Sequence, residues 1–101
     1  MTAPDAEPAS GAALTRTVTI VNRRGLHARA AARFVKTAER FKAEITVARK
    51  DAVVSGLSIM GLMMLAAASG TSIIVEATGK EAAEVLEALT ALINARFGED
   101  D

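Results

Sequence analysis

Hydrophobic and polar positions along the chain follow two periods, and each period predicts one kind of element. Apolar and polar side chains alternate over four stretches, which is typical of half-buried β-strands. Two other stretches repeat apolar positions at intervals of three and four, the spacing of helices with a buried stripe, and a third, residues 57–68, is apolar nearly all round, so that part of it is either in the core or exposed for binding. The predicted strands cover residues 14–21, 43–50, 52–55 and 72–77, and the predicted helices cover 26–41, 57–68 and a last stretch that runs to about residue 97.

The order β-α-β-β-α-β-α indicates the fold class. Strands with one polar face and helices with an apolar stripe imply two layers, an antiparallel sheet covered on one side. The short turn at Lys50 and Asp51 predicts a hairpin between the second and third strands. Residues 1–14 lack large apolar side chains apart from their ends, so we expect a disordered tail before a domain of residues 15–101.

Local residue types predict where the later helices begin and end. Ser58 is suited to the N-cap position of the second helix, and Gly70 to a left-handed position that ends it. Thr78 and Glu81 have the spacing of a capping box for the third helix. The acidic segment from Gly98 onward is expected to fray.

Composition removes several classes of function. The chain has 101 residues, no cysteine and one histidine, so we expect one domain without disulfides, thiolate catalysis or a transition-metal site. Aromatic residues are 3% of the chain, which argues against a base-stacking nucleic-acid module. There is neither a secretory signal nor an apolar run near the ~20 residues that span a bilayer, so we expect a cytoplasmic protein.

Charge is distributed unevenly although the net charge is zero. Residues 15–50 hold ten Lys or Arg and two acids, whereas residues 51–101 hold two Lys or Arg and eight acids. Four cations recur at helical spacing on one stripe: Arg29, Arg33, Lys36 and Arg40. This stripe indicates either a basic face for an acidic partner or ordinary solvated charge.

The single histidine, His27, follows a turn and precedes a helical stretch. Gly25 permits a tight turn that would leave His27 at the helix N-terminus, where unpaired N–H groups and the helix dipole favour an anion. An uncharged imidazole nitrogen is a nucleophile, so we interpret His27 as a phosphoryl carrier. The competing interpretation is a plain surface or capping residue.

Neighbouring groups fit transient phosphate binding. The amides of Ala28 and Arg29 could donate to phosphoryl oxygens, and the Arg29 guanidinium could balance their charge. No carboxylate lies beside His27 in the sequence, and no Gly-rich nucleotide loop is present. We therefore expect a stoichiometric carrier, not an enzyme, with no cofactor and with a phosphoryl donor on another protein.

Two motifs now resemble a known family. Residues 25–29 read Gly-Leu-His-Ala-Arg, residues 58–61 read Ser-Ile-Met-Gly, and residues 68–71 also match the family's pattern. Together, over residues 14–97, they resemble the histidine-containing phosphocarrier protein, HPr, of the bacterial phosphoenolpyruvate-dependent phosphotransferase system. The resemblance implies a four-stranded antiparallel sheet with three helices on one face, an α+β open-faced sandwich.

The resemblance also implies partners and residue roles. His27 would take phosphate on Nδ1 from enzyme I and pass it to enzyme IIA domains, with Arg29 as charge partner. Ser58 would be a regulatory phosphorylation site for a dedicated HPr kinase. A docking patch beside His27 would be formed by Leu26, Ile59, Met60, Leu62 and Met63. We expect a monomer, with neither a nucleic acid nor a membrane as partner.

One position departs from the family and two alternatives stay open. Ala30 stands where the family usually has proline, which would fix the first helical turn. The chain could serve the nitrogen-related branch of the same system, with the same chemistry and a regulatory output. A rival of another class is a small ligand-binding regulatory domain on the same two-layer fold, which would not need His27.

Overall fold

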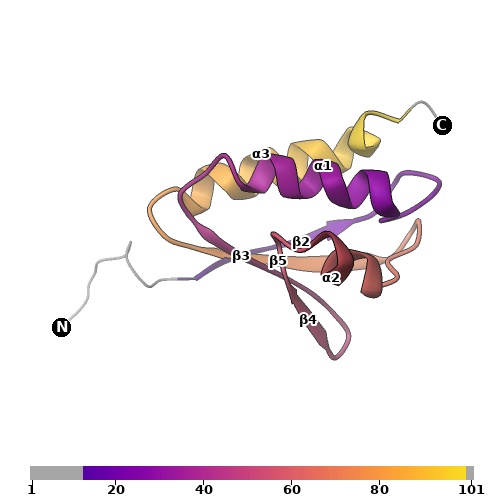
Figure 1. The fold of residues 1–101 in the computed structure, drawn as a ribbon, viewed down its shortest axis with the longest axis horizontal. Coiled ribbons are helices and arrows are strands. Elements are labelled where there is room, and N and C mark those ends of the chain that lie inside the picture. The colour runs from indigo at the N-terminus through magenta and orange to yellow at the C-terminus, as the bar shows by residue number, and fades with distance from the viewer. Residues whose placement is uncertain (1–12, 100–101) are drawn as a thin grey trace.

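The protein, seen in a computed structural model that describes residues 13–99, contains one four-stranded sheet (Figure 1). The strand order is β2-β5-β3-β4, and every neighbouring pair is antiparallel. The hairpin predicted at residues 50–51 joins β3 to β4. The strands are β2 (Leu14–Thr19), β3 (Glu44–Arg49), β4 (Ala52–Ser55) and β5 (Ser72–Thr78).

The helices form the second layer. Helices α1 and α3 lie side by side over one face of the sheet, and α2 packs against α1 and β4 (Figure 1). Their bounds are α1 (Ala28–Ala38), α2 (Ile59–Met64) and α3 (Ala82–Asn94), followed by a short 3₁₀ turn, η1 (Arg96–Gly98). The predicted α+β open-faced sandwich and its element order are thereby confirmed. Within residues 13–99, no helix is long and apolar enough to cross a membrane.

The core lies between the sheet and the helices. The apolar residues on one face of β3 and β5 are buried, as is Val18 of β2, and α1 and α3 each contribute one stripe. Phe34 of α1 is fully buried. Burial of a large apolar side chain stabilises the fold by about 1.5–3 kcal/mol. The members that the periodicity predicted include Val18, Ile20, Ala31, Phe34, Ala38, Ile45, Val47, Ile73, Val75, Val85, Leu86, Leu89 and Ile93.

Helix α2 ends earlier than predicted. It stops at Met64, because Ala66 takes a left-handed conformation (φ +52°) and the Arg49 guanidinium donates to the Leu65 carbonyl at 3.2 Å. Gly70 is left-handed but does not end the helix, and its N–H donates to the carbonyl oxygen of Ile20, directly after β2, at 2.7 Å. The segment after α2 thus leaves the helix to contact the loop that follows β2.

The capping box predicted for α3 is wrong. Thr78 is the last residue of β5 and pairs with Glu44, so it stays in the sheet. Glu81 itself is the N-cap residue, and its carboxylate accepts from the backbone N–H of Lys42 at 2.7 Å. The boundary of the tail also moves, because Leu14 begins β2; the rest of the expected tail, residues 1–12, lies outside the described residues.

Candidate functional site

The loop between β2 and α1 positions His27. Gly25 is left-handed (φ +70°), and a Cβ there would lie 2.6 Å from the Ala67 carbonyl oxygen. The N–H of the next residue, Leu26, donates to that same oxygen at 2.9 Å. Glycine is therefore required twice, for the turn and for the close approach, and both serve to bring His27 to the start of α1.

His27 is the N-cap residue of α1, with an extended backbone, and its side chain makes no cap hydrogen bond. The first-turn N–H groups of α1 consequently have no partner within the helix. The ring, whose side chain is 19% exposed, lines a shallow pocket of about 230 Å³ together with Arg24, Leu26 and residues 66–68. No described residue hydrogen-bonds to Nδ1. An anion could thus approach both the ring and the helix terminus.

A carboxylate lies against the other ring nitrogen. Glu99 Oε2 pairs with His27 Nε2, and Glu99 Oε1 accepts from Asn22 Nδ2 at 3.0 Å. Burial acts to raise the pKa of Glu99, but hydrogen bonds from His27 and Asn22, and the charges of His27 and Arg24, outweigh it and leave the pKa below 4.5. Glu99 is therefore ionised at neutral pH. Sequence analysis missed this residue.

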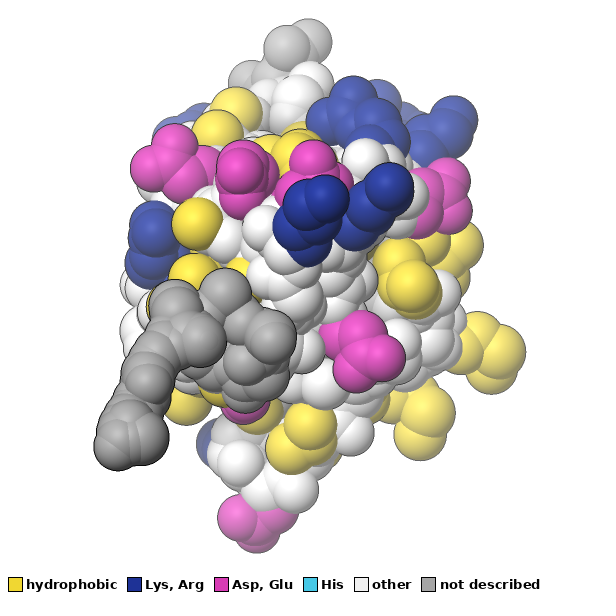
Figure 2. All heavy atoms as spheres, turned by 90° about the vertical axis from the view of Figure 1, so that its left-hand side faces the viewer, with side chains coloured by type: hydrophobic (Ala, Val, Ile, Leu, Met, Phe, Trp, Pro, Cys, Tyr) yellow, Lys and Arg dark blue, Asp and Glu magenta, His cyan; other side chains and the backbone are white. Residues whose placement is uncertain are grey.

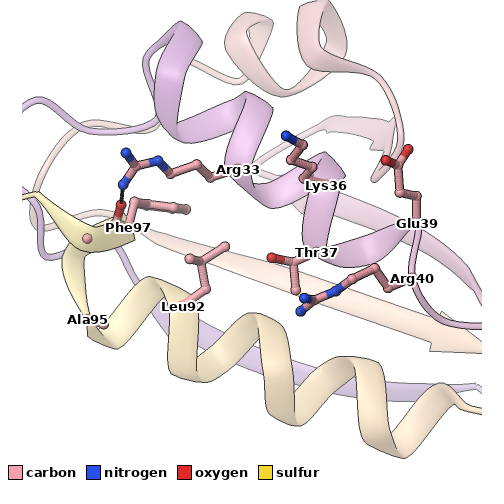
Figure 3. Close-up of a pocket in the computed structure, with 9 residues that line it drawn as sticks. Arg33, Lys36, Thr37, Glu39, Arg40, Leu92, Ala95 and Phe97 are labelled. Carbon is pink, nitrogen blue, oxygen red and sulfur yellow. Dashed lines mark hydrogen bonds between the residues drawn. The ribbon is translucent and has the colours of Figure 1, made fainter.

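The chain returns to His27 through a fixed C-terminal turn. Phe97 is fully buried, and the Arg33 guanidinium donates to its carbonyl oxygen, as the close-up of this region shows (Figure 3). The expected fraying is wrong for Gly98 and Glu99, whereas residues 100–101 lie outside the described residues. One signal was available: Phe97 comes four residues after Ile93 and extends the apolar stripe of α3 by one turn.

Arg29 lies in the first turn of α1, two residues after His27. Its side chain is exposed and forms neither a hydrogen bond nor an ion pair with a described residue. Ala28 is the first residue of the helix, so its N–H and that of Arg29 belong to the unpaired first turn. The positions of both fit the phosphate-binding role expected of them.

The basic stripe lies on the outer surface of the helix layer. Figure 2, which views the molecule from the side at which α1 ends, shows Lys and Arg side chains gathered over that layer. Part of the stripe borders an open groove of about 650 Å³ between α1 and α3, with Leu92 and Phe97 among its apolar lining (Figure 3). All four cations of the stripe are exposed: Arg29, Arg33, Lys36 and Arg40.

Ser58 is the N-cap residue of α2, as predicted. Its Oγ accepts from the N–H of Gly61 at 2.9 Å, which satisfies one donor of the first turn. The side chain is partly exposed, so the hydroxyl combines a structural role with access from solvent.

Helix α2 presents apolar side chains to solvent. Met60 is 74% exposed and Met64 78%, and Ile59 and Met63 are exposed as well. We call these four residues the α2 patch. Two members of the expected docking set, Leu26 (5%) and Leu62 (0%), are buried beneath the surface, whereas Met64, which was not among them, is exposed. Helical spacing turns Leu62 inward toward α1 and the core.

No described part of the chain gathers three or more His, Cys, Asp or Glu side chains that could hold a metal ion. The site consists of an imidazole, a helix N-terminus, a guanidinium and a carboxylate. Such a set can accept and release an anionic group.

Comparisons with known proteins agree with the geometry. Residues 14–95 match the family model described as the PTS HPr component phosphorylation site. Phosphocarrier protein HPr of Neisseria meningitidis is 52% identical over 88 residues, 87% of this chain and 99% of that protein. Phosphocarrier protein NPr of Shewanella violacea is 42% identical over 86 residues, 85% of this chain and 94% of that protein. The crystal structure of HPr-C-His from Thermoanaerobacter tengcongensis superposes with a TM-score of 0.83 at 40% identity, and the match covers 87% of this chain and 99% of that one.

Proposed function

Since the chain belongs to the HPr family of phosphocarrier proteins of the phosphotransferase system, we propose that His27 is the residue that carries the phosphoryl group. The observation that supports this most is a partly exposed ring at an uncapped helix N-terminus. The phosphoryl group would come from phosphorylated enzyme I and go to enzyme IIA domains. The protein would act in the cytoplasm as a stoichiometric intermediate and a monomer.

The geometry supports Nδ1 as the accepting atom. Nε2 is paired with Glu99, whereas no described residue engages Nδ1. After transfer, the N–H groups of Ala28 and Arg29 would donate to phosphoryl oxygens, and the Arg29 guanidinium would balance their charge. These donors are few, which suits a carrier that must release its phosphoryl group.

Partner docking would use the α2 patch together with the basic stripe. Exposed methionines adapt their shape to different partners, which suits a protein that must meet both a donor and several acceptors. The cations of α1 would be attracted to an acidic surface on enzyme I and speed the encounter.

Ser58 would be a regulatory phosphorylation site for a dedicated kinase. A phosphate at the helix N-terminus is locally favourable, but it adds about two negative charges beside the α2 patch. We expect this charge to slow phosphorylation of His27 by enzyme I. The family includes relatives named HPr and NPr, and the higher identity to the former favours the sugar branch over the nitrogen-related one.

A labelling experiment tests the proposal. The chain is incubated with enzyme I and labelled phosphoenolpyruvate, and the parent is expected to gain one acid-labile phosphoryl group. His27→Ala should gain none, and Ser58→Ala should be labelled like the parent. Equal labelling of His27→Ala would show that the carrier residue lies elsewhere.

A further inference from the structure

We propose that the groove between α1 and α3 is a binding site for a small amphipathic anion, an organic acid with one anionic head and an aliphatic or aromatic body. The groove has a volume of about 650 Å³. Small-molecule sites in proteins occupy about 300–1,000 Å³. The described residues that line the groove include neither His27 nor any member of the α2 patch, so the site is separate from the proposed carrier function.

The α3 wall of the groove is apolar. It consists of Leu92 and Ala95 and continues into the turn at Phe97 and Gly98, and none of these residues has a polar side chain. Leu92 packs against the core but is only partly buried, so part of an aliphatic side chain faces the groove. An apolar body placed along this wall would remove that surface from water.

The α1 wall is cationic. Arg33, Lys36 and Arg40 follow one another at offsets of three and four, so they lie on one side of the helix over about 10 Å. In Figure 3, Arg40 extends from α1 toward α3, and Arg33 reaches the Phe97 carbonyl at the end of the groove. A ligand that fits both walls would therefore carry a negative charge on the side that faces α1 and an apolar body on the side that faces α3.

Two of these cations are available to such a ligand. Neither Lys36 nor Arg40 forms a hydrogen bond or an ion pair with a described residue. Glu39 is the one acid among the described residues of the lining, and its carboxylate points away from the space between the helices (Figure 3). The anionic head would thus lie beside Lys36 and Arg40 and accept charge-assisted hydrogen bonds from them.

The lining selects against more polar anions. Thr37 is the one uncharged side chain with a hydrogen-bonding group among the described lining residues. A sugar phosphate would place hydroxyl groups against Leu92 and Ala95, where they would lose hydrogen bonds to water without replacement. Inorganic phosphate would leave the apolar wall uncovered. The groove therefore suits an acyl or aryl acid.

Fluorescence titration of the full chain with 8-anilinonaphthalene-1-sulfonate, an aromatic body with one sulfonate, tests the site. We expect saturable binding and competition by octanoate, but not by octylammonium, glucose 6-phosphate or inorganic phosphate. The double variant Lys36→Gln, Arg40→Gln should bind the probe about 10-fold more weakly, because two charge-assisted contacts are lost. Lys80→Gln, which changes an exposed cation outside the groove, should bind the probe like the parent.

Ala95→Glu tests the apolar wall without a change in the core. Ala95 is exposed, and a carboxylate at this position would pair with the α1 cations and repel the anionic head. The variant should bind the probe about 10-fold more weakly than the parent. Ala91→Glu, at an exposed position of α3 outside the groove, is the matched control.

Backbone amide chemical shifts on addition of octanoate locate the bound anion. We expect the changes to centre on residues 36–40 and 92–98. Changes centred on Met60 and Met64 would overturn the inference, as would equal probe affinities of the double variant and Lys80→Gln. Binding of a polyglutamate peptide without binding of octanoate would also overturn it, since the groove would then serve an acidic protein partner. His27→Ala should bind the probe like the parent, so this test is independent of the proposed function.

Discussion

Helices α1 and α2 both begin after an N-cap residue with an extended backbone, but the two N-cap side chains have different hydrogen-bond partners. Both follow an extended N-cap residue, His27 (φ −79°, ψ −179°) or Ser58 (φ −113°, ψ 110°). The Ser58 hydroxyl accepts a hydrogen bond from the first turn of its own helix. The His27 ring instead turns toward Glu99 and leaves the first turn of α1 uncapped. One start is closed by its own side chain and the other is open to an incoming anion.

The two helices also differ in what they show to solvent. The outer face of α1 is basic, and that of α2 is apolar with two prominent methionines, Met60 and Met64. The first surface suits long-range attraction and the second suits close contact. The following changes exchange or remove one property at a time.

Exchanging the cap has the largest expected effect. His27→Ser should lose all acid-labile labelling, yet it should be more stable than His27→Ala by about 1 kcal/mol, because a serine N-cap satisfies a first-turn donor. Urea unfolding of both variants measures the difference. Equal stabilities would show that the start of α1 is already satisfied in another way.

Placing charge in the α2 patch comes next. Met60→Glu should weaken binding to enzyme I about 10-fold, the equivalent of about 1.4 kcal/mol, while the unfolding midpoint stays unchanged because the side chain is 74% exposed. Val53→Glu on β4, a position 66% exposed outside the patch, is the matched control. If both variants bound alike, the patch would have no special role.

Removing the closed cap should affect stability and leave labelling intact. Ser58→Ala loses the bond to the Gly61 N–H and is expected to be less stable by about 1 kcal/mol. Ser69→Ala, an exposed loop serine, serves as the comparison. If the two variants had the same melting temperature in thermal unfolding, the N-cap role of Ser58 would be contradicted.

The smallest expected effect is the pH dependence that Glu99 contributes. Although burial acts to raise its pKa, the bonds from His27 and Asn22 lower it below 4.5, so folding favours the carboxylate. This contribution to stability is present above the unfolded value and is lost as the pH falls through the folded-state pKa. As the pH is lowered from about 6 to about 3, the free energy of unfolding should therefore fall less steeply in Glu99→Gln than in the parent. Parallel curves of unfolding free energy against pH would show that the bonds from His27 and Asn22 do not lower the pKa of Glu99.

Periodicity predicted the sheet, the helices and nearly all of the core, because these depend on which residues can be buried together. His27 and Ser58 were correctly placed at helix starts because a helix start depends on residue types that are close together in the sequence. Helix ends and the last residues were predicted less well, since they depend on distant partners: Glu81 bonds to Lys42, and Glu99 meets His27 across 72 positions. In the sequence, Glu99 resembles an ordinary solvated acidic residue, and only the fold shows that it pairs with His27.

The bond from the Leu26 amide to the Ala67 carbonyl joins the loop before α1 to the loop after α2. With no room for any side chain at Gly25, the two loops are locked together without a gap. The His27 ring and the α2 patch are therefore held at a fixed distance and angle to each other, so a partner that bound the patch as proposed would meet the ring in one orientation.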